Sequence, residues 1–284
     1  MHPIGLTLVV GILYLVVGYG QPDKEELKGD GFSMRLEYYE DEETAPALDQ
    51  AGEGKIETRK TGLPEVCSRS DPELSKCITN VMNSIRFNLA EGDFGYGPLA
   101  PTLDPYRIKL LDIENGQSFK VLLRNTTIGG IGDYQIENLR QDLSQKKFTF
   151  RLKLPTLLTK GKYDLNMYIF LLRVYGKGDF NMTLIDTIAD MTAQYFLQEQ
   201  DGKNYVKFRP MDVRLQFGKA SFYLDNLFDG DQNLGQIGNS AVNNYPYLLL
   251  DQVKTGIETH LRRSVTTMAN AIVNGAEENE ILLP

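Results

Sequence analysis

Between Ile108 and Phe228 the sequence alternates apolar and polar residues, and this period of two constrains the fold more than any other feature. The clearest segments are 148–154, 163–171, 182–184 and 211–217. A β-strand places successive side chains on opposite faces, so each segment is predicted to be a half-buried strand. Short turns separate them and no helical pattern intervenes. We therefore expect successive strands of about 7 to 14 residues in an antiparallel meander.

Two glycine-containing segments mark breaks within this region. Asp201-Gly202 lies between two apolar segments and predicts a tight hairpin. Gly176 and Gly178 are interpreted as a turn or a bulge. A phosphate-binding loop is disfavoured there, because no helix pattern follows and Asp179 would face the anion.

A long amphipathic helix is predicted from Asn244 to Asn274. Its apolar stripe consists of Leu250, Val253, Ile257, Leu261, Val265, Met268 and Ile272. Pro246 suits the first turn and Gly275 can end the helix. At about 1.5 Å per residue it would reach about 45 Å. One way to bury the stripe is to wrap a curved antiparallel sheet around the helix, and this would give an α+β fold, a strongly curved antiparallel sheet around a long C-terminal helix.

A shorter helix is predicted after Ser70, which would cap it together with Glu73. Pro72 suits its first turn. Its apolar residues at helical spacing are Leu74, Ile78, Val81, Ile85 and Leu89. Gly92 is expected to end this helix, and the Gly- and Pro-rich segment 92–106 to form an extended connection.

The amino terminus is typical of a secretory signal peptide. Residues 4–17 carry no charge, and Gly18-Tyr19-Gly20 offers small residues for cleavage, so residues 1–20 are the predicted signal peptide. A membrane anchor is the alternative, but a spanning helix needs about 20 apolar residues. The charged start that signal peptides usually have is reduced to the α-amino group and His2. We expect a secreted, extracellular protein with no integral membrane span after cleavage.

An oxidising compartment gives meaning to the cysteines and to two sequons. Cys67 and Cys77 are the only cysteines and are predicted to form a disulfide, with two buried free thiols as the alternative. The tripeptides that begin at Asn125 and Asn181 match the glycosylation sequon. Such tripeptides also arise by chance, so glycans at these two asparagines are expectations.

Residues 21–62 form an acidic segment. Positions 22–62 hold twelve acids and six bases, so they contribute 6 − 12 = −6 of the net charge of −8. Without apolar periodicity this segment is predicted to be a disordered extension, either a solvated tail or a docking site for a partner or receptor. The acidic balance also disfavours nucleic acid and anionic membrane surfaces as partners.

Enzymatic chemistry is disfavoured by composition. The chain holds 2 His and 2 Cys, and cleavage after Gly20 would leave His260 as the single histidine. The best catalytic set available is His260 with Asp251 or Glu258 and a serine, but no G-x-S-x-G turn positions a nucleophile. His260 is therefore predicted to be a surface or boundary residue. We expect no catalytic residue, no metal and no cofactor.

Several short motifs occur in a fixed order along the chain. They are Cys67, Asp71-Pro72, Cys77, Gly92, Leu103-Asp104-Pro105, Leu154-Pro155, Gly161-Lys162-Tyr163-Asp164 and Asp225-Asn226-Leu227-Phe228. In this order and spacing the chain resembles the insect takeout and juvenile-hormone-binding family from about residue 63 to 274. Two departures are the acidic extension and Asn244-Tyr245-Pro246, where the family often has Trp.

The resemblance implies one domain over residues 63–284, with a bent sheet around the C-terminal helix, an amino-terminal disulfide and an interior tunnel for one elongated apolar ligand. The implied ligands are terpenoids such as juvenile hormone, or fatty acyl compounds, and no motif distinguishes them. We expect a secreted carrier; the alternative is an extracellular interaction protein with a structural lipid and a partner-docking extension.

Candidate lining residues come from the inward strand positions and the helix stripe. They are Met167, Ile169, Leu171, Met182, Leu184, Phe217, Phe222, Leu224, Leu250, Val253, Ile257, Leu261, Val265 and Met268. The alternative for each is ordinary core packing. Polar contacts to the ligand head are expected from tyrosines such as Tyr163, Tyr168, Tyr195 or Tyr223, because a hydroxyl can bond an ester or an epoxide.

Overall fold

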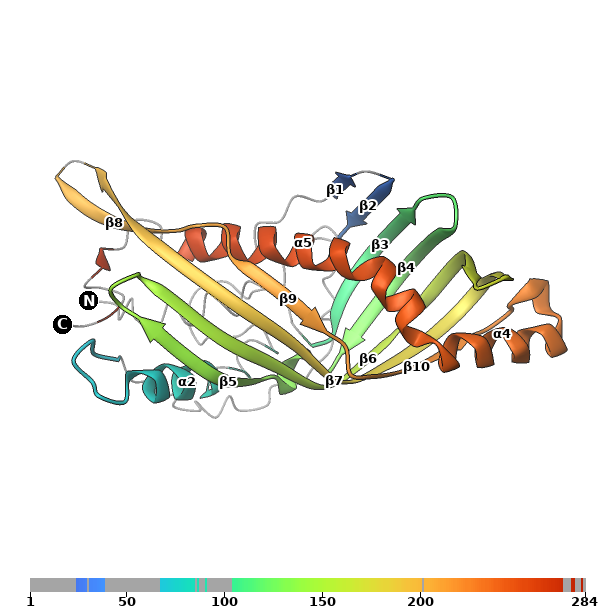
Figure 1. Cartoon of the computed structure of the whole chain (residues 1–284), viewed down its shortest axis with the longest axis horizontal. Coiled ribbons are helices and arrows are strands. Elements are labelled where there is room, and N and C mark those ends of the chain that lie inside the picture. The colour runs from blue at the N-terminus through green and yellow to red at the C-terminus, as the bar shows by residue number, and fades with distance from the viewer. Residues whose placement is uncertain are drawn as a thin grey trace, which may run out of the picture.

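The protein folds as one curved antiparallel sheet that holds a long helix along its inner face (Figure 1). The computed structural model describes residues 24–29, 31–38, 67–84, 86, 90, 104–200, 202–272, 277–278 and 282. The predicted signal peptide and most of the predicted connection 92–106 lie outside these residues and stay predictions.

Within the described residues ten strands form the sheet, and every strand pair is antiparallel, as the period-two pattern predicted. The main path runs β1-β2-β3-β4-β6-β7-β10; β5 pairs with β6, while β8 and β9 pair with β7. The strands are β1 (Lys24–Gly29), β2 (Phe32–Glu37), β3 (Tyr106–Asn115), β4 (Phe119–Gly129), β5 (Gln135–Asp142), β6 (Lys147–Ile169), β7 (Leu172–Gln200), β8 (Lys203–Phe208), β9 (Asp212–Gln216) and β10 (Lys219–Leu224).

Two very long strands form the centre of the sheet. β6 has 23 residues and β7 has 29, much longer than the expected 7 to 14. Each half of β6 pairs with a different neighbour, β5 along 147–153 and β4 along 158–167. The predicted strands at 148–154 and 163–171 are therefore the two halves of one strand. The sequence did not show the join because the alternation lapses between them.

The interpretation of Gly176 and Gly178 as a turn or bulge is wrong. Both lie inside β7, in continuous register with β6. A Cβ atom at Gly176 would lie 2.8 Å from Leu227 Cα, and one at Gly178 would lie 2.6 Å from Asp225 O. The glycines are needed because the backbone of residues 225–227 crosses β7 at contact distance.

The amino-terminal segment 21–62 is not disordered throughout. Lys24–Gly29 and Phe32–Glu37 form a β-hairpin, and β2 pairs with β3 over six positions. Leu27, Met34 and Leu36 are buried in it. The alternation in this stretch is short and lies among many charges, so net charge obscured it. Residues 39–66 lie outside the described part of the chain.

The C-terminal helix is confirmed as α5 (Pro246–Ile272), which spans 27 residues along the long axis of the molecule (Figure 1). Its polar side chains accept hydrogen bonds from the edge formed by β8, β9 and the residues between them. Glu258 accepts from Leu215 N at 2.7 Å, Thr266 from Met211 N at 2.9 Å and Asn270 from Phe208 N at 2.8 Å. The helix therefore satisfies an edge of the sheet that would otherwise be exposed.

A second helix, α4 (Gln232–Asn244), was not predicted. Asp231 caps it by accepting from Asn233 N and Leu234 N. Its Asn239 and Asn243 bond the backbone N–H and C=O of Leu224 and Phe222, so α4 covers the free edge of β10. Its many Asn, Gln and Gly residues give weak helical periodicity, and tertiary bonds to β10 compensate for their low helix propensity.

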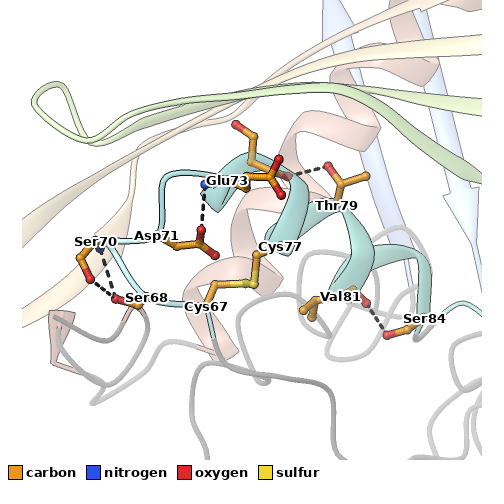
Figure 2. The surroundings of a disulfide bond; sticks show 10 residues. Cys67, Ser68, Ser70, Asp71, Glu73, Cys77, Thr79, Val81 and Ser84 are labelled. Carbon is orange, nitrogen blue, oxygen red and sulfur yellow. Dashed lines mark hydrogen bonds between the residues drawn. A yellow bond between two sulfur atoms is a disulfide. The ribbon is translucent and has the colours of Figure 1, made fainter.

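The first predicted helix is confirmed as α2 (Leu74–Ser84), with Ile85 and Leu89 outside the described residues. Figure 2 shows that Asp71, and not Ser70, accepts from the N-terminal backbone, at 2.7 Å from Glu73 N. The Ser70 hydroxyl bonds Ser68 instead. The predicted disulfide joins Cys67 to Cys77 of this helix.

Candidate ligand-binding interior

Two apolar clusters lie between the sheet and α5. The α2-end cluster includes Tyr134, Phe150, Met211 and Val265. The α4-end cluster includes Met34, Ile113, Met167 and Leu227. Tyr106, Phe217 and Ile257 pack against both clusters and are nevertheless part-exposed. We call these three residues the junction.

Most candidate lining residues do face this interior. Eight are buried: Met167, Ile169, Leu184, Phe222, Leu224, Leu250, Val253 and Val265. Met182, Phe217, Ile257 and Leu261 are part-buried and pack against one or both clusters. The side chain of Met268 lies outside the described residues. The structure therefore brings strand and helix candidates together in one apolar interior, while their role in ligand binding stays a prediction.

Leu171 is the exception, and its prediction as a lining residue is wrong. It is 98% exposed at the turn between β6 and β7. Strand β6 ends at Ile169, and Phe170 adopts a φ of 54° as the chain reverses. In the sequence the apolar alternation continues to Leu171, two residues past the last residue of the strand. Periodicity alone cannot show where a strand ends.

The four tyrosines expected to contact a ligand head are either exposed or bonded to other groups of the chain. Tyr168 and Tyr223 are exposed, so their prediction as interior groups is wrong. The buried Tyr163 donates to Asp225 O, and Tyr195 donates to Glu278 Oε1 at 2.8 Å. Burial raises the pKa of both of these phenols, so they stay protonated donors that fix the chain.

The sequence did not predict a cluster of polar side chains inside the fold, which consists of His260, Glu25 and Tyr38. His260 is only 8% exposed, and the prediction that it lies at the surface or boundary is wrong. Its Nδ1 lies 2.5 Å from Glu25 Oε2 in β1, and its Nε2 lies 3.0 Å from the Tyr38 hydroxyl. The carboxylate partner is thus Glu25, 235 positions away, rather than Asp251 or Glu258.

This group joins the amino-terminal hairpin to α5 and borders the junction. The Tyr38 ring lies 6.4 Å from the ring of Tyr106 and stacks on His260 at 6.2 Å. Burial is the main cause that raises the pKa of both Tyr38 and Tyr106, and the negative charge of Glu25 adds to it. Both tyrosines therefore keep neutral hydroxyls, Tyr106 within the junction and Tyr38 next to it.

Ser264 completes a Ser-His-carboxylate sequence in space but not a catalytic geometry. Its hydroxyl lies 3.4 Å from His260 Nε2, farther than the Tyr38 hydroxyl that bonds the same nitrogen at 3.0 Å. Ser264 is also buried. Among the residues that the structure describes, no group of three His, Cys, Asp or Glu side chains is arranged to hold a metal ion.

The short motifs that carry the family resemblance stabilise the fold rather than line the interior. Asp104 accepts hydrogen bonds from Gly130 N and Gly132 N and so holds the turn after β4. Tyr163 donates to the backbone of Asp225, and Asn226 donates to Lys177 O at 2.8 Å. These motifs therefore specify how strands cross one another and carry no information on the ligand.

The two predicted glycosylation sites lie on the surface. Asn125 is exposed at a bulge between β4 and β6, with a φ of 50°. Asn181 is exposed on β7. In the part of the chain that the structure describes, no helix is both long enough and apolar enough to cross a membrane.

The structure defines a class of α+β protein in which a curved antiparallel sheet surrounds one long helix and an apolar interior lies between them. The sequence profile described as haemolymph juvenile hormone binding protein (JHBP) matches residues 51–283. The chain therefore belongs to the haemolymph juvenile hormone binding protein family.

Comparison with solved structures supports the same fold. The structure titled "Crystal Structure of Epiphyas postvittana Takeout 1" superimposes with a TM-score of 0.64 and 19% sequence identity, over 78% of this chain and 100% of that one. A structure of lipopolysaccharide binding protein aligns over 54% of this chain and 31% of that one with 8% identity, but its TM-score of 0.29 is too low to carry an argument. Comparison with curated protein sequences gave no significant match.

Proposed function

We propose that this protein is a secreted carrier that holds one small lipophilic molecule between its sheet and α5. The observation that carries this proposal is the junction, where Tyr106, Phe217 and Ile257 pack against both clusters yet stay part-exposed. Large apolar side chains that are inside a fold but not fully covered are suited to border a ligand. Membership of the JHBP family supports the same proposal.

The proposed ligand class is a terpenoid, such as a juvenile hormone, or a fatty acyl compound. Burial of about fifteen carbons at roughly 0.8 kcal/mol each offers about 12 kcal/mol before association costs are subtracted. Micromolar to nanomolar binding follows from that margin. Tyr106 belongs to the junction and the Tyr38 ring lies 6.4 Å from the Tyr106 ring, so the hydroxyls of these two residues are the proposed contacts for a polar ligand head.

The alternative, an interaction protein with a free docking extension, receives less support. Residues 24–29 and 32–37 pair with the sheet, and Glu25 is bound to α5 through His260. This part of the segment therefore acts as a wall of the fold. A docking role would have to come from residues outside that hairpin.

The test is native mass spectrometry of the protein purified from a secreting host, followed by solvent extraction and identification of what is released. A stoichiometric apolar molecule would support the carrier, and the same spectra would report signal cleavage and glycans at Asn125 and Asn181. Recovery of a chemically unchanged molecule after long incubation would argue against hydrolysis. A protein that is empty and takes up neither terpenoids nor fatty acids would contradict the proposal.

A further inference from the structure

The turn between β6 and β7 presents two large apolar side chains to water. Phe170 is 66% exposed and Leu171 is 98% exposed. Phe170 also has a φ of 54°, in the left-handed region where Gly and Asn are the usual residues. A turn that only reversed the chain would gain stability from either of those residues. This chain instead has the aromatic residue Phe170 at this position, and the left-handed conformation costs conformational free energy.

Phe170 contacts the residue that joins α4 to α5. The Phe170 ring packs edge-on against Tyr245, with ring centroids 5.0 Å apart, and Tyr245 packs against Tyr247. Tyr245 also lines a surface hollow of about 580 Å³ along α4, together with Ile237. Figure 1 shows the β6–β7 turn beside α4 at one end of the long axis. We call this surface the apolar end; its residues are Tyr168, Phe170, Leu171, Ile237, Tyr245 and Tyr247.

The apolar end carries no charge on the segments that form it. No Asp, Glu, Lys, Arg or His occurs in residues 165–172 or in residues 232–250, although 24% of the whole chain is charged. The flanking charges are Asp164, Arg173, Asp231 and Asp251. The remaining side chains around the hollow are the amides and hydroxyl of Asn233, Gln236, Ser240 and Asn244, together with Ala241.

This combination matches the interface of a lipid layer with neutral headgroups. Tyrosine rings are enriched at headgroup level, where one end of the ring is apolar and the other is wet. Neutral amides can donate to ester and phosphate oxygens without a salt-dependent attraction. Leu171 and Phe170 project from a turn, and such a shape enters a deformable layer more readily than it covers a rigid partner. A second copy of this chain is a less suitable partner, because a stable interface of roughly 1,200 Å² needs two broad complementary faces, whereas Phe170 and Leu171 project from a two-residue turn.

We propose that the apolar end docks the protein on a lipid surface with electrically neutral headgroups. Phe170 and Leu171 enter the apolar layer, while Tyr168, Tyr245 and Tyr247 lie among the headgroups. Docking of this kind goes beyond the carrier function and gives a water-insoluble ligand a route between membrane and protein. It does not require a ligand in the interior, so the two proposals are tested separately.

The experiment is flotation of the full mature protein with phosphatidylcholine vesicles. The variant Phe170→Asn/Leu171→Ser keeps a residue that tolerates the left-handed turn, and it should lower the vesicle partition coefficient by about tenfold or more. The matched control is Leu158→Ser, which removes an exposed leucine from the middle of β6 and should leave partitioning unchanged. Partitioning of the wild-type protein should also depend little on salt, because the two segments that form the apolar end contain no charged residue.

The proposal is overturned by no partitioning of the wild-type protein, by equal partitioning of the double variant, or by loss of partitioning at high salt. A wild-type dimer that the double variant converts to a monomer, without vesicle binding, would overturn it in favour of an interface between copies. Partitioning by a protein that takes up no lipophilic molecule would support the docking surface and contradict only the carrier function.

Discussion

Glu25 of the amino-terminal hairpin and His260 of α5 lie 235 positions apart in the chain and share a hydrogen bond of 2.5 Å. Other side chains of α5, those of Glu258, Thr266 and Asn270, bond the β8–β9 edge. The sheet therefore meets the helix at two separate edges. Strand pairing does not close the sheet, and α5 lies in the gap that the two edges leave.

The first prediction concerns this bond. His260→Phe should lower the free energy of unfolding by about 3 to 5 kcal/mol, because it leaves the carboxylate of Glu25 buried without its main partner. Urea unfolding measures the loss. Arg263→Gln is the matched control: Arg263 lies 3.5 Å from the same carboxylate but is 59% exposed, so its loss should cost less than about 1 kcal/mol. Equal losses in both variants would contradict the importance of the histidine.

The second prediction tests how closely the hairpin packs on α5. A Cβ atom at Gly256 would lie 2.5 Å from the Phe32 ring and 2.6 Å from the Met34 sulfur. Gly256→Ala should displace the hairpin and destabilise the fold, because overpacking of about 1 to 3 kcal/mol outweighs the gain in helix propensity. Gly235→Ala in α4, where the nearest atom is 3.9 Å away, should instead stabilise by about 0.5 to 1 kcal/mol. Thermal unfolding distinguishes the two, and a stabilised Gly256→Ala would argue that the hairpin is loosely attached.

The third prediction concerns the disulfide between Cys67 and Cys77. Cys67→Ser should lower the free energy of unfolding by about 2 to 4 kcal/mol, since the cross-link restricts the unfolded chain and ties the start of α2. Circular dichroism in urea gives the value. The wild-type protein under reducing conditions is the control and should match the variant. No difference between oxidised and reduced protein would show that α2 is held by packing alone.

The fourth prediction concerns acid stability. Burial alone would raise the pKa of Glu278, but hydrogen bonds from Lys146 and Tyr195 and the charge of Arg69 lower it below its ordinary value of 4.5. A lowered pKa in the folded state stabilises the protein above pH 4.5, and this contribution is lost as the pH falls through the folded-state pKa.

Glu278→Gln should therefore show a smaller fall in melting temperature between about pH 7 and about pH 3 than the wild-type protein. Glu277→Gln is the neighbouring control, because Glu277 pairs with the exposed Lys203 and should leave the pH dependence almost unchanged. Parallel pH profiles for the wild-type protein and Glu278→Gln would refute the assignment.

The fifth prediction separates a ligand space from a filled core. Ile257→Trp at the junction should lower the uptake of a fluorescent fatty acid while costing less than about 1.5 kcal/mol of stability. Val265→Trp, at a position that is buried and packed in the α2-end cluster, should destabilise the fold by overpacking. Strong destabilisation in both variants would mean that the junction holds no space for a ligand.

Much of the fold was predictable because it depends on local periodicity. The alternation along β6 and β7 predicted half-buried antiparallel strands, and the stripe from Leu250 to Val265 predicted α5. The spacing of Cys67 and Cys77 predicted the disulfide. In each case a single segment presents one face to the interior, so its period reports which face is buried.

The candidate interior was only partly predictable. Periodicity identified Met167 and Leu184 as inward residues, but it also extended to Leu171, because a turn does not interrupt an apolar alternation by itself. It missed α4, whose Asn239 and Asn243 bond the backbone of β10 as well as the backbone of their own helix. Composition assigned the hairpin to a disordered extension, although three of its apolar residues are buried.

The sequence by itself determined the alternating strands between Ile108 and Phe228, the long helix and the disulfide, since each depends on neighbours within a few residues or one short loop. Only the tertiary structure decided where the edges of the curved sheet meet α5. This arrangement buries His260 with Glu25 and Tyr38, and it leaves Phe170 and Leu171 exposed to water. The physical reason is that the sheet edges that meet α5 come from strands far apart in the chain. A period of two specifies which face of a strand is buried, but not what that face or that edge will meet.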